Sequence, residues 1–241
     1  MKAKERHHLK ENEFVTTTAT VVEAVRANRD QFLIGAIAVV LVVGIGGGWW
    51  YWHKRTNDEA SSMLGIGMAI AQAPIAPPPT VPGATQTPGT YPSDDARQQA
   101  ALQAFQQVAS LYPSTQAGLA AKYQAGVALM ALARFPEAEQ AFTAVADQAG
   151  TSSLYGSMAH LGRAEALENE SKYDEAIKVL TDLAAQRDTM VPVDGVLMQL
   201  AQTYVKAGKP QDARAAFKRV VDEFPDSPYA GEARQQLTTL G

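Results

Sequence analysis

The sequence has no cysteine among its 241 residues, which removes a cysteine nucleophile and leaves the redox compartment open. It also lacks a phosphate-binding GxxxxGK[ST] loop, an HExxH zinc motif and a GxSxG nucleophile elbow. Neither sign of charge dominates, since 21 basic and 25 acidic residues leave a net charge of −4. These absences predict a protein that is not an enzyme, holds no metal or cofactor, and binds neither nucleic acid nor a small-molecule substrate.

Histidine is scarce, with four residues in the chain. His7 and His8 lie in a charged N-terminal tail, where we favour a solvated pair over a metal site because no further ligands stand nearby. His53 follows a cluster of aromatic residues, so an interfacial anchor is favoured over a haem or pigment ligand. His160 falls within a predicted repeat helix and is interpreted as ordinary packing.

An apolar stretch near the N-terminus, the 21 residues from Phe32 to Trp52, carries no charge. As an α-helix this run would be roughly 31 Å long, which matches a hydrocarbon core of about 30 Å. A cleavable signal peptide has a shorter apolar region, and the nearest Ala-x-Ala pattern, at Ala69–Ala71, lies far downstream. A buried core helix is the other alternative, but such helices rarely stay uncharged for so long. Residues 31–55 are therefore predicted to form a retained transmembrane helix with its anchor.

The predicted span and its flanks carry features typical of membrane helices. Gly44 and Gly48 form a GxxxG pair that would let a second transmembrane helix approach closely, although glycine is also common in spans generally. Residues 1–30 form a tail that fits either an interfacial helix or an extended segment, so this region would contact membrane lipid. The anchor combines aromatic rings at headgroup level with two cations in water: Trp49, Trp50, Trp52, Lys54 and Arg55.

The distribution of Lys and Arg predicts the orientation of the span. Six of these residues precede it, whereas only Lys54 and Arg55 occur between it and Arg97. Within about twenty residues of either membrane face the counts are equal, so the bias comes from the distal tail. By the positive-inside rule the N-terminus would be cytoplasmic and the larger part of the chain periplasmic, as a single-pass protein of a bacterial inner membrane.

Beyond the span, β-type alternation is lacking and helical patterning dominates, apart from a proline-rich segment at 76–93 that predicts an exposed loop. Four segments share an alanine, a large apolar residue four positions later and a branched aliphatic residue three positions beyond. The leading alanines are 37, 38 and 37 residues apart. The four copies are Ala101/Phe105/Val108, Ala138/Phe142/Val145, Ala176/Leu180/Leu183 and Ala213/Phe217/Val220.

A second helix precedes each of the last three copies and carries a small residue at the equivalent position: Gly126, Ala164 or Ala201. A small residue at the crossing point and a large one on the partner helix allow close helical hairpins, which stack because one hairpin cannot bury its apolar face alone. This pattern looks like the tetratricopeptide repeat, although its usual period is about 34 residues. The predicted fold class is all-α, with a single N-terminal transmembrane helix followed over residues 56–241 by a tetratricopeptide-like right-handed superhelix of stacked helical hairpins.

The first helix of each hairpin usually lines the concave face of such a stack. Methionine is flexible and polarizable, so a groove that carries it would accept varied apolar segments. The alternative is that the same side chains belong to the core. The candidate binding residues, by helical register, are Tyr123, Val127, Met130, Met158, Leu161, Met198 and Gln202.

Three features together resemble the bacterial single-span membrane proteins known as ancillary subunits of the Sec translocon. They are the short polar tail with HLKENEF (8–14), the span that ends in aromatic residues, and the repeats that follow a proline-rich interruption. The resemblance covers nearly the whole chain, but the repeat motif is shared with many unrelated scaffolds. It implies a cytoplasmic N-terminus, a periplasmic repeat domain, and contacts with translocon subunits and periplasmic chaperones.

Two functions are compatible with these features. The first is a membrane-anchored adaptor whose periplasmic repeats bind other proteins near the export machinery. The alternative is a structural accessory subunit of a large respiratory or photosynthetic membrane complex. An adaptor would copurify substoichiometrically with its partners, whereas a structural subunit would occur at fixed stoichiometry in one complex.

Overall fold

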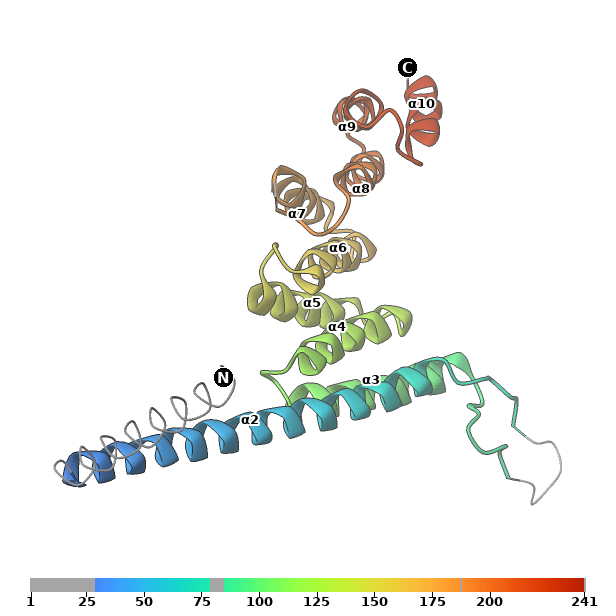
Figure 1. Cartoon of the computed structure of the whole chain (residues 1–241). Helices are drawn as coiled ribbons and strands as arrows, with labels where there is room; N and C mark the ends of the chain where they lie inside the picture. The colour runs from blue at the N-terminus through green and yellow to red at the C-terminus, as the bar shows by residue number, and fades with distance from the viewer. Residues whose placement is uncertain (1–28, 79–84, 187, 241) are drawn as a thin grey trace, which may run out of the picture. The chain divides into compact units, whose positions relative to one another are not determined.

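A computed structural model describes residues 29–78, 85–186 and 188–240 (Figure 1). The chain divides into two compact units, Met1–Arg55 and Thr56–Gly241, which are described separately. The regular elements of the described residues are all helices, and one isolated parallel bridge joins Ile75 to Tyr91.

Helix α2 (Arg29–Ala71) supplies the described part of the first unit with its residues up to Arg55. Its apolar side chains there are exposed, for example Val40 at 69% and Val42 at 71%. Among the described helices, this one is long and apolar enough to cross a membrane by length and composition. A helix hydrogen-bonds its own backbone N–H and C=O groups. It can therefore lie in the bilayer core, where no water is present to form those bonds.

The second unit is a series of helical hairpins, coloured from cyan to red along Figure 1. Its first helix is the C-terminal part of α2, from Thr56 to Ala71. The helices that follow are α3 (Asp94–Leu111), α4 (Gln116–Ala131), α5 (Phe135–Ala149), α6 (Leu154–Asn169), α7 (Tyr173–Ala185), α8 (Val193–Lys206), α9 (Pro210–Glu223) and α10 (Ala230–Thr239).

The turns inside three hairpins, α4–α5, α6–α7 and α8–α9, have the same backbone geometry. Each contains one residue in the left-handed region, namely Ala133, Ser171 or Gly208, with φ of 54°, 61° and 70°. In every case the next residue donates its N–H to the carbonyl five positions earlier, at 2.8–2.9 Å. This is the Schellman pattern of helix termination, which closes the first helix and directs the chain back along it.

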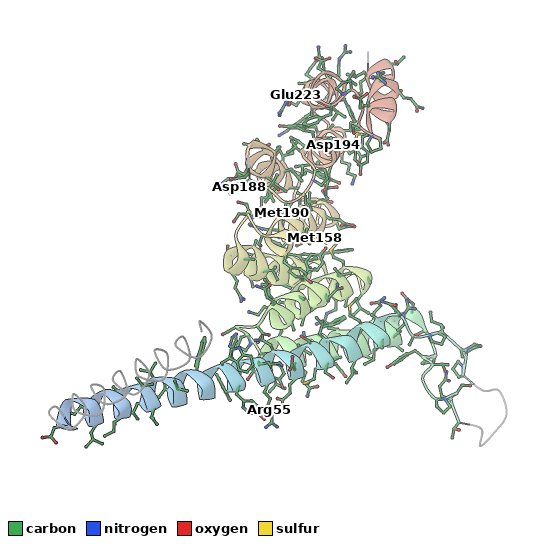
Figure 2. All side chains as sticks on the ribbon, viewed as in Figure 1. Arg55, Met158, Asp188, Met190, Asp194 and Glu223 are labelled. Atoms are coloured by element: carbon green, nitrogen blue, oxygen red, sulfur yellow. The ribbon has the colours of Figure 1, made fainter. Side chains whose placement is uncertain are left out.

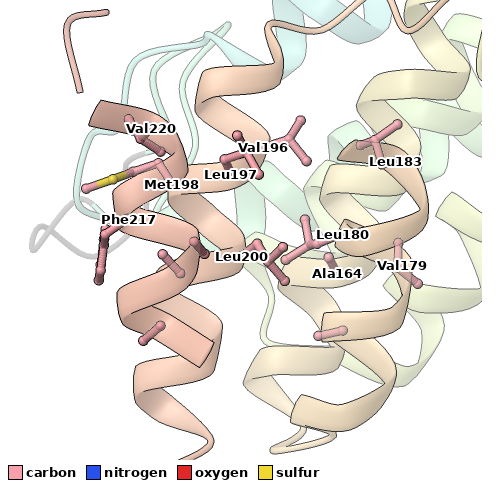
Figure 3. Packing of buried hydrophobic residues seen from close by; sticks show 14 of the residues in the cluster. Ala164, Val179, Leu180, Leu183, Val196, Leu197, Met198, Leu200, Phe217 and Val220 are labelled. Atoms are coloured by element: carbon pink, nitrogen blue, oxygen red, sulfur yellow. The ribbon is translucent and has the colours of Figure 1, made fainter. Parts of the chain in front are cut away.

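The side chains that define the sequence repeat form the core. Phe105, Phe142, Leu180 and Phe217 are at most 2% exposed, and the alanine four positions before each of them is fully buried. Figure 3 shows Leu180 and Phe217 within the C-terminal cluster, which α6, α7, α8, α9 and α10 build together. The predicted all-α fold of stacked, tetratricopeptide-like hairpins is confirmed.

The first hairpin encloses the proline-rich segment. A β-carbon built at Gly67 of α2 would lie 2.7 Å from the Phe105 ring of α3, so only glycine permits this approach. The loop returns to its start through the N–H of Tyr91, which donates to the Pro74 carbonyl at 3.1 Å, and through Arg97, whose Nη1 donates to the Ala73 carbonyl at 3.2 Å. These bonds hold the described ends of a long insertion together without disturbing the helical pair.

Candidate functional site

Helices α4 and α6 enclose an apolar groove of about 410 Å³ in the repeat unit. Cavities of a few hundred Å³ with mostly apolar walls are typical of binding sites. The aliphatic side chain of Val127 is 40% exposed in this groove, so its lining is accessible. The groove is lined by Tyr123, Val127 and Met130 of α4, Phe142 of α5, Met158, Leu161, Gly162 and Glu165 of α6, and Gln199 of α8.

Phe142 forms the floor of the groove between two glycines. A β-carbon built at Gly126 of α4 would lie 2.7 Å from the Phe142 ring, and one built at Gly162 of α6 would lie equally close to it. Both helices therefore come so close to the ring that any side chain at position 126 or 162 would collide with it, and glycine is required at both. Phe142 thus fixes the separation of α4 and α6, and with it the width of the groove.

Tyr123 forms one aromatic wall. Its ring centroid lies 5.6 Å from that of Phe142 and 5.9 Å from that of Tyr155, with interplanar angles of 53° and 52°. Tilted aromatic pairs at such distances are energetically favourable. Burial raises the pKa of the Tyr123 hydroxyl, and the neighbouring charges of Glu165 and Tyr155 raise it further. The tyrosine therefore stays neutral at physiological pH and offers a hydroxyl beside a carboxylate.

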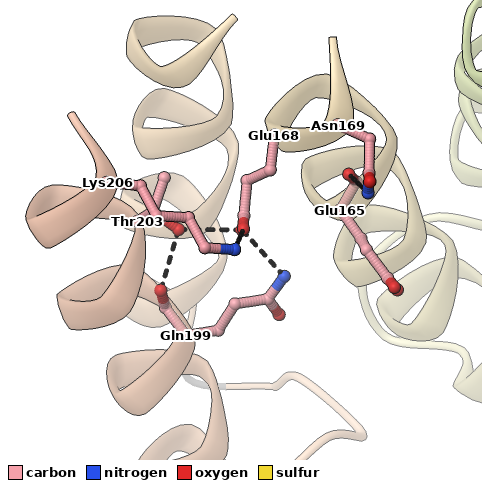
Figure 4. Close-up of polar contacts among 6 residues, drawn as sticks. All are labelled: Glu165, Glu168, Asn169, Gln199, Thr203 and Lys206. Carbon is pink, nitrogen blue, oxygen red and sulfur yellow. Dashed lines mark hydrogen bonds and ion pairs between the residues drawn. The ribbon is translucent and has the colours of Figure 1, made fainter. Parts of the chain in front are cut away.

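A buried carboxylate ties α6 to α8 next to the groove (Figure 4). Glu168 accepts hydrogen bonds from Thr203 Oγ1 at 2.8 Å, Gln199 Nε2 at 3.2 Å and Lys206 Nζ at 2.5 Å. A buried charge is stable only when it is paired and fully hydrogen-bonded, and these three donors meet that requirement. Gln199 also lines the groove, so this network positions the polar end of the site.

Five of the seven residues predicted for the concave face line this one groove: Tyr123, Val127, Met130, Met158 and Leu161. Met158 is labelled on α6 in Figure 2. Gln202 is exposed but lies outside the groove lining, and its Nε2 donates to Glu232 Oε1 of α10 at 3.3 Å. Met198 is 3% exposed and packs in the C-terminal core with Phe217, so for this residue the core alternative holds and the predicted place on the concave face is wrong.

His160 contributes to a separate polar cavity between α6 and α7. The cavity also involves Arg163 and Asp182, and burial lowers the pKa of the His160 imidazole. In the part of the chain that the structure describes, no group of three or more His, Cys, Asp or Glu side chains could hold a metal ion. His7 and His8 lie outside the described residues.

The apolar part of α2 presents the predicted helix-contact and anchor residues. A β-carbon at Gly44 or Gly48 would meet no atom of the described residues within 4 Å, so this part of the chain leaves the space beside both glycines open. The Trp49 and His53 rings stack with centroids 5.3 Å apart, and Lys54 Nζ lies 5.6 Å from the Trp50 ring centroid. Trp52 and Arg55 follow on the same helix.

Four residues of the groove lining are absent from the predicted concave face: Phe142, Gly162, Glu165 and Gln199. The repeat motif places Phe142 in the core, and the other three have no predicted role. Glu165 follows Ala164 as Val127 follows Gly126, and both are exposed. The same register that selected Val127 could therefore have found Glu165. Gln199 could not be found in this way, because its place depends on how α8 packs against α6 through Glu168.

These hairpins and their apolar groove define a helical-repeat protein of the solenoid class. Two family models described as tetratricopeptide repeat match overlapping parts of the chain, residues 123–190 and 166–237. The chain therefore contains a tetratricopeptide-repeat domain. Such repeats indicate a protein–protein interaction scaffold. No curated protein matches the chain.

Solved structures support the same fold. Two crystal structures show the nearly identical TPR-like repeats of a candidate kinesin light chain from Podosopora anserina. The first, a variant, has 16% sequence identity and a TM-score of 0.56, and the match covers 76% of this chain and 85% of that one. The second has 15% identity and the same TM-score, with 76% and 86% coverage. At this identity the likeness concerns the fold alone.

Proposed function

We propose that this protein is a non-catalytic, membrane-anchored adaptor whose repeat domain binds other proteins through the α4–α6 groove. The observation that carries the proposal is the groove itself, an accessible apolar cavity of about 410 Å³ with two methionines in its lining. An apolar surface with flexible methionines accommodates side chains of varied shape. The rigid Phe142 floor keeps the groove preformed, so little ordering is needed on binding.

The membrane location is part of the same proposal. The apolar run of α2, its GxxxG pair and its aromatic and cationic end support a retained single span. The excess of Lys and Arg before the span supports a cytoplasmic N-terminus and a periplasmic repeat domain in a bacterial inner membrane. The resemblance noted for the whole chain suggests partners at the export machinery, either translocon subunits or periplasmic chaperones. Confinement to the membrane would raise the local concentration of such partners.

Site-specific crosslinking in membranes tests this function. With a photoreactive side chain in place of Val127, we expect covalent adducts with a small, reproducible set of proteins, because this side chain is exposed inside the groove. The same group in place of Glu175 is the control, since Glu175 is exposed on α7 and does not line the groove. Mass spectrometry of the adducts identifies the partners.

The identity of the adducts separates the alternatives. Exported or membrane proteins, recovered at substoichiometric levels and only from the Val127 variant, would support the adaptor. A single large complex at fixed stoichiometry would favour a structural subunit instead. Cytoplasmic partners would overturn the orientation, and identical adducts from both variants would overturn the role of the groove.

The glycine pair of the span gives a second expected outcome. Replacing Gly44 and Gly48 with Leu should reduce the recovery of membrane partners in mild detergent, because the added side chains would fill the space that a second helix needs. The matched control replaces Gly46 and Gly47 with Leu, since these glycines lie on the same helix between the pair and are equally open. Equal recovery with both double variants would refute a role for the pair in helix contact.

A further inference from the structure

The positively charged side chains around the α4–α6 groove have polar or charged partners, whereas one carboxylate of its lining forms no ion pair with the described residues. Helices α4, α6 and α8, all fully described, carry three Lys or Arg residues, and each already has a partner. Lys122 Nζ donates to Gln148 Oε1 at 2.6 Å, Arg163 Nε lies 3.6 Å from Glu139 Oε1, and Lys206 binds Glu168. None of these three cations forms an ion pair with Glu165, the carboxylate of the groove lining.

Glu165 is that carboxylate. It lines the groove, is exposed, and forms no ion pair with the described residues. Figure 4 shows its side chain outside the Glu168 network of dashed contacts. Its charge is felt inside the groove, because it contributes to the raised pKa of Tyr123. The groove therefore combines apolar walls with one unneutralised negative charge at its edge.

We infer that the groove selects a protein segment in which a bulky apolar side chain stands beside a Lys or Arg. The apolar side chain would contact Val127, Met130 and Met158, and the cation would lie next to the Glu165 carboxylate. An acidic segment would place two negative charges together at the mouth of an apolar cavity, which is unfavourable. This inference rests on the proposed function and adds to it the charge of the partner.

Binding of short synthetic peptides to the full chain in detergent micelles tests the inference. The peptides share one apolar core with two leucines and differ only in the flanking residue, which is Lys, Gln or Glu. We expect the wild-type protein to bind the Lys peptide most tightly and the Glu peptide most weakly. Each step should change the dissociation constant by ~2- to 5-fold at low salt, as for an exposed ion pair. Added salt should compress the differences.

Variants of Glu165 make the test specific. Glu165→Gln should remove the preference between the peptides, and Glu165→Lys should reverse it. Glu175→Lys makes the same charge change on α7 outside the groove and should leave the order intact. Circular dichroism of each variant checks that the helices are retained, which is expected because Glu165 is exposed.

The outcomes also separate this inference from the proposed function. If wild-type protein binds all peptides equally, or if Glu165→Lys leaves the order unchanged, the charge selection is wrong while a protein-binding groove stands. If no peptide binds, the charge selection is overturned as well. Whether the groove binds proteins at all is then decided by the crosslinks from Val127, which do not depend on these peptides.

Discussion

Replacing Phe142 with Ala is expected to destabilise the repeat domain by about 3–5 kcal/mol and to abolish binding in the α4–α6 groove. The ring is 2% exposed and fills the space between Gly126 and Gly162, neither of which has a side chain that could replace it. Its removal leaves a cavity whose walls are two helix backbones, and backbones collapse poorly. Denaturant unfolding followed by circular dichroism measures the loss of stability.

Phe217→Ala is the matched control for this prediction. Phe217 is 0% exposed, occupies the same register in α9, and belongs to the C-terminal cluster without lining the groove. Its loss should cost a similar free energy but leave crosslinking from Val127 intact. Amide hydrogen exchange should quicken over α4, α5 and α6 in the Phe142 variant and over α8 and α9 in the control, because each repeat contacts mainly its neighbours. A loss below about 1 kcal/mol for Phe142→Ala would contradict its role as the floor.

The repeat fold could be predicted from the sequence because its determinants are local and periodic. An alanine, a large apolar residue and a branched aliphatic residue recur in one register, and the side chains concerned are buried as the pattern predicts. The first hairpin departs from the spacing of the others. Its glycine, Gly67, contacts Phe105, which lies 38 residues later, whereas Gly126 contacts Phe142 only 16 residues later. The difference arises because the proline-rich insertion separates the two helices of the first hairpin.

The groove was only partly predictable from register. Tyr123, Leu161 and Met198 hold the same position, three residues before the small residue of their helix. The first two line the groove, whereas Met198 is buried in a cluster that also contains Ala233 of the terminal helix α10. Helical register gives the side of a helix on which a residue lies, but it does not say whether another helix covers that side. That depends on non-local packing at the end of the stack.

The predicted anchor leads to the other large expected effect, which is the loss of membrane association when Val39 and Val42 are both replaced by Arg. Residues 32–52 include one Phe, two Leu, three Ile and four Val, which favour insertion by about 3–6 kcal/mol in total. Two arginines near the centre of the span cost about 5–7 kcal/mol, enough to cancel that gain. The double variant should therefore move from the carbonate-resistant membrane fraction to the soluble fraction.

The matched control places the same two charges at the same spacing, i and i+3, further along α2. Ile66→Arg with Ala69→Arg changes exposed positions of the repeat unit, beyond the apolar run. That protein should remain in the membrane fraction, because its span is unaltered. If the wild-type chain itself is recovered as a soluble protein that begins beyond Arg55, the run is a removed leader and the adaptor is not anchored. If the Val39 and Val42 variant stays carbonate-resistant, another segment must hold the chain at the membrane, and the single-span topology is wrong.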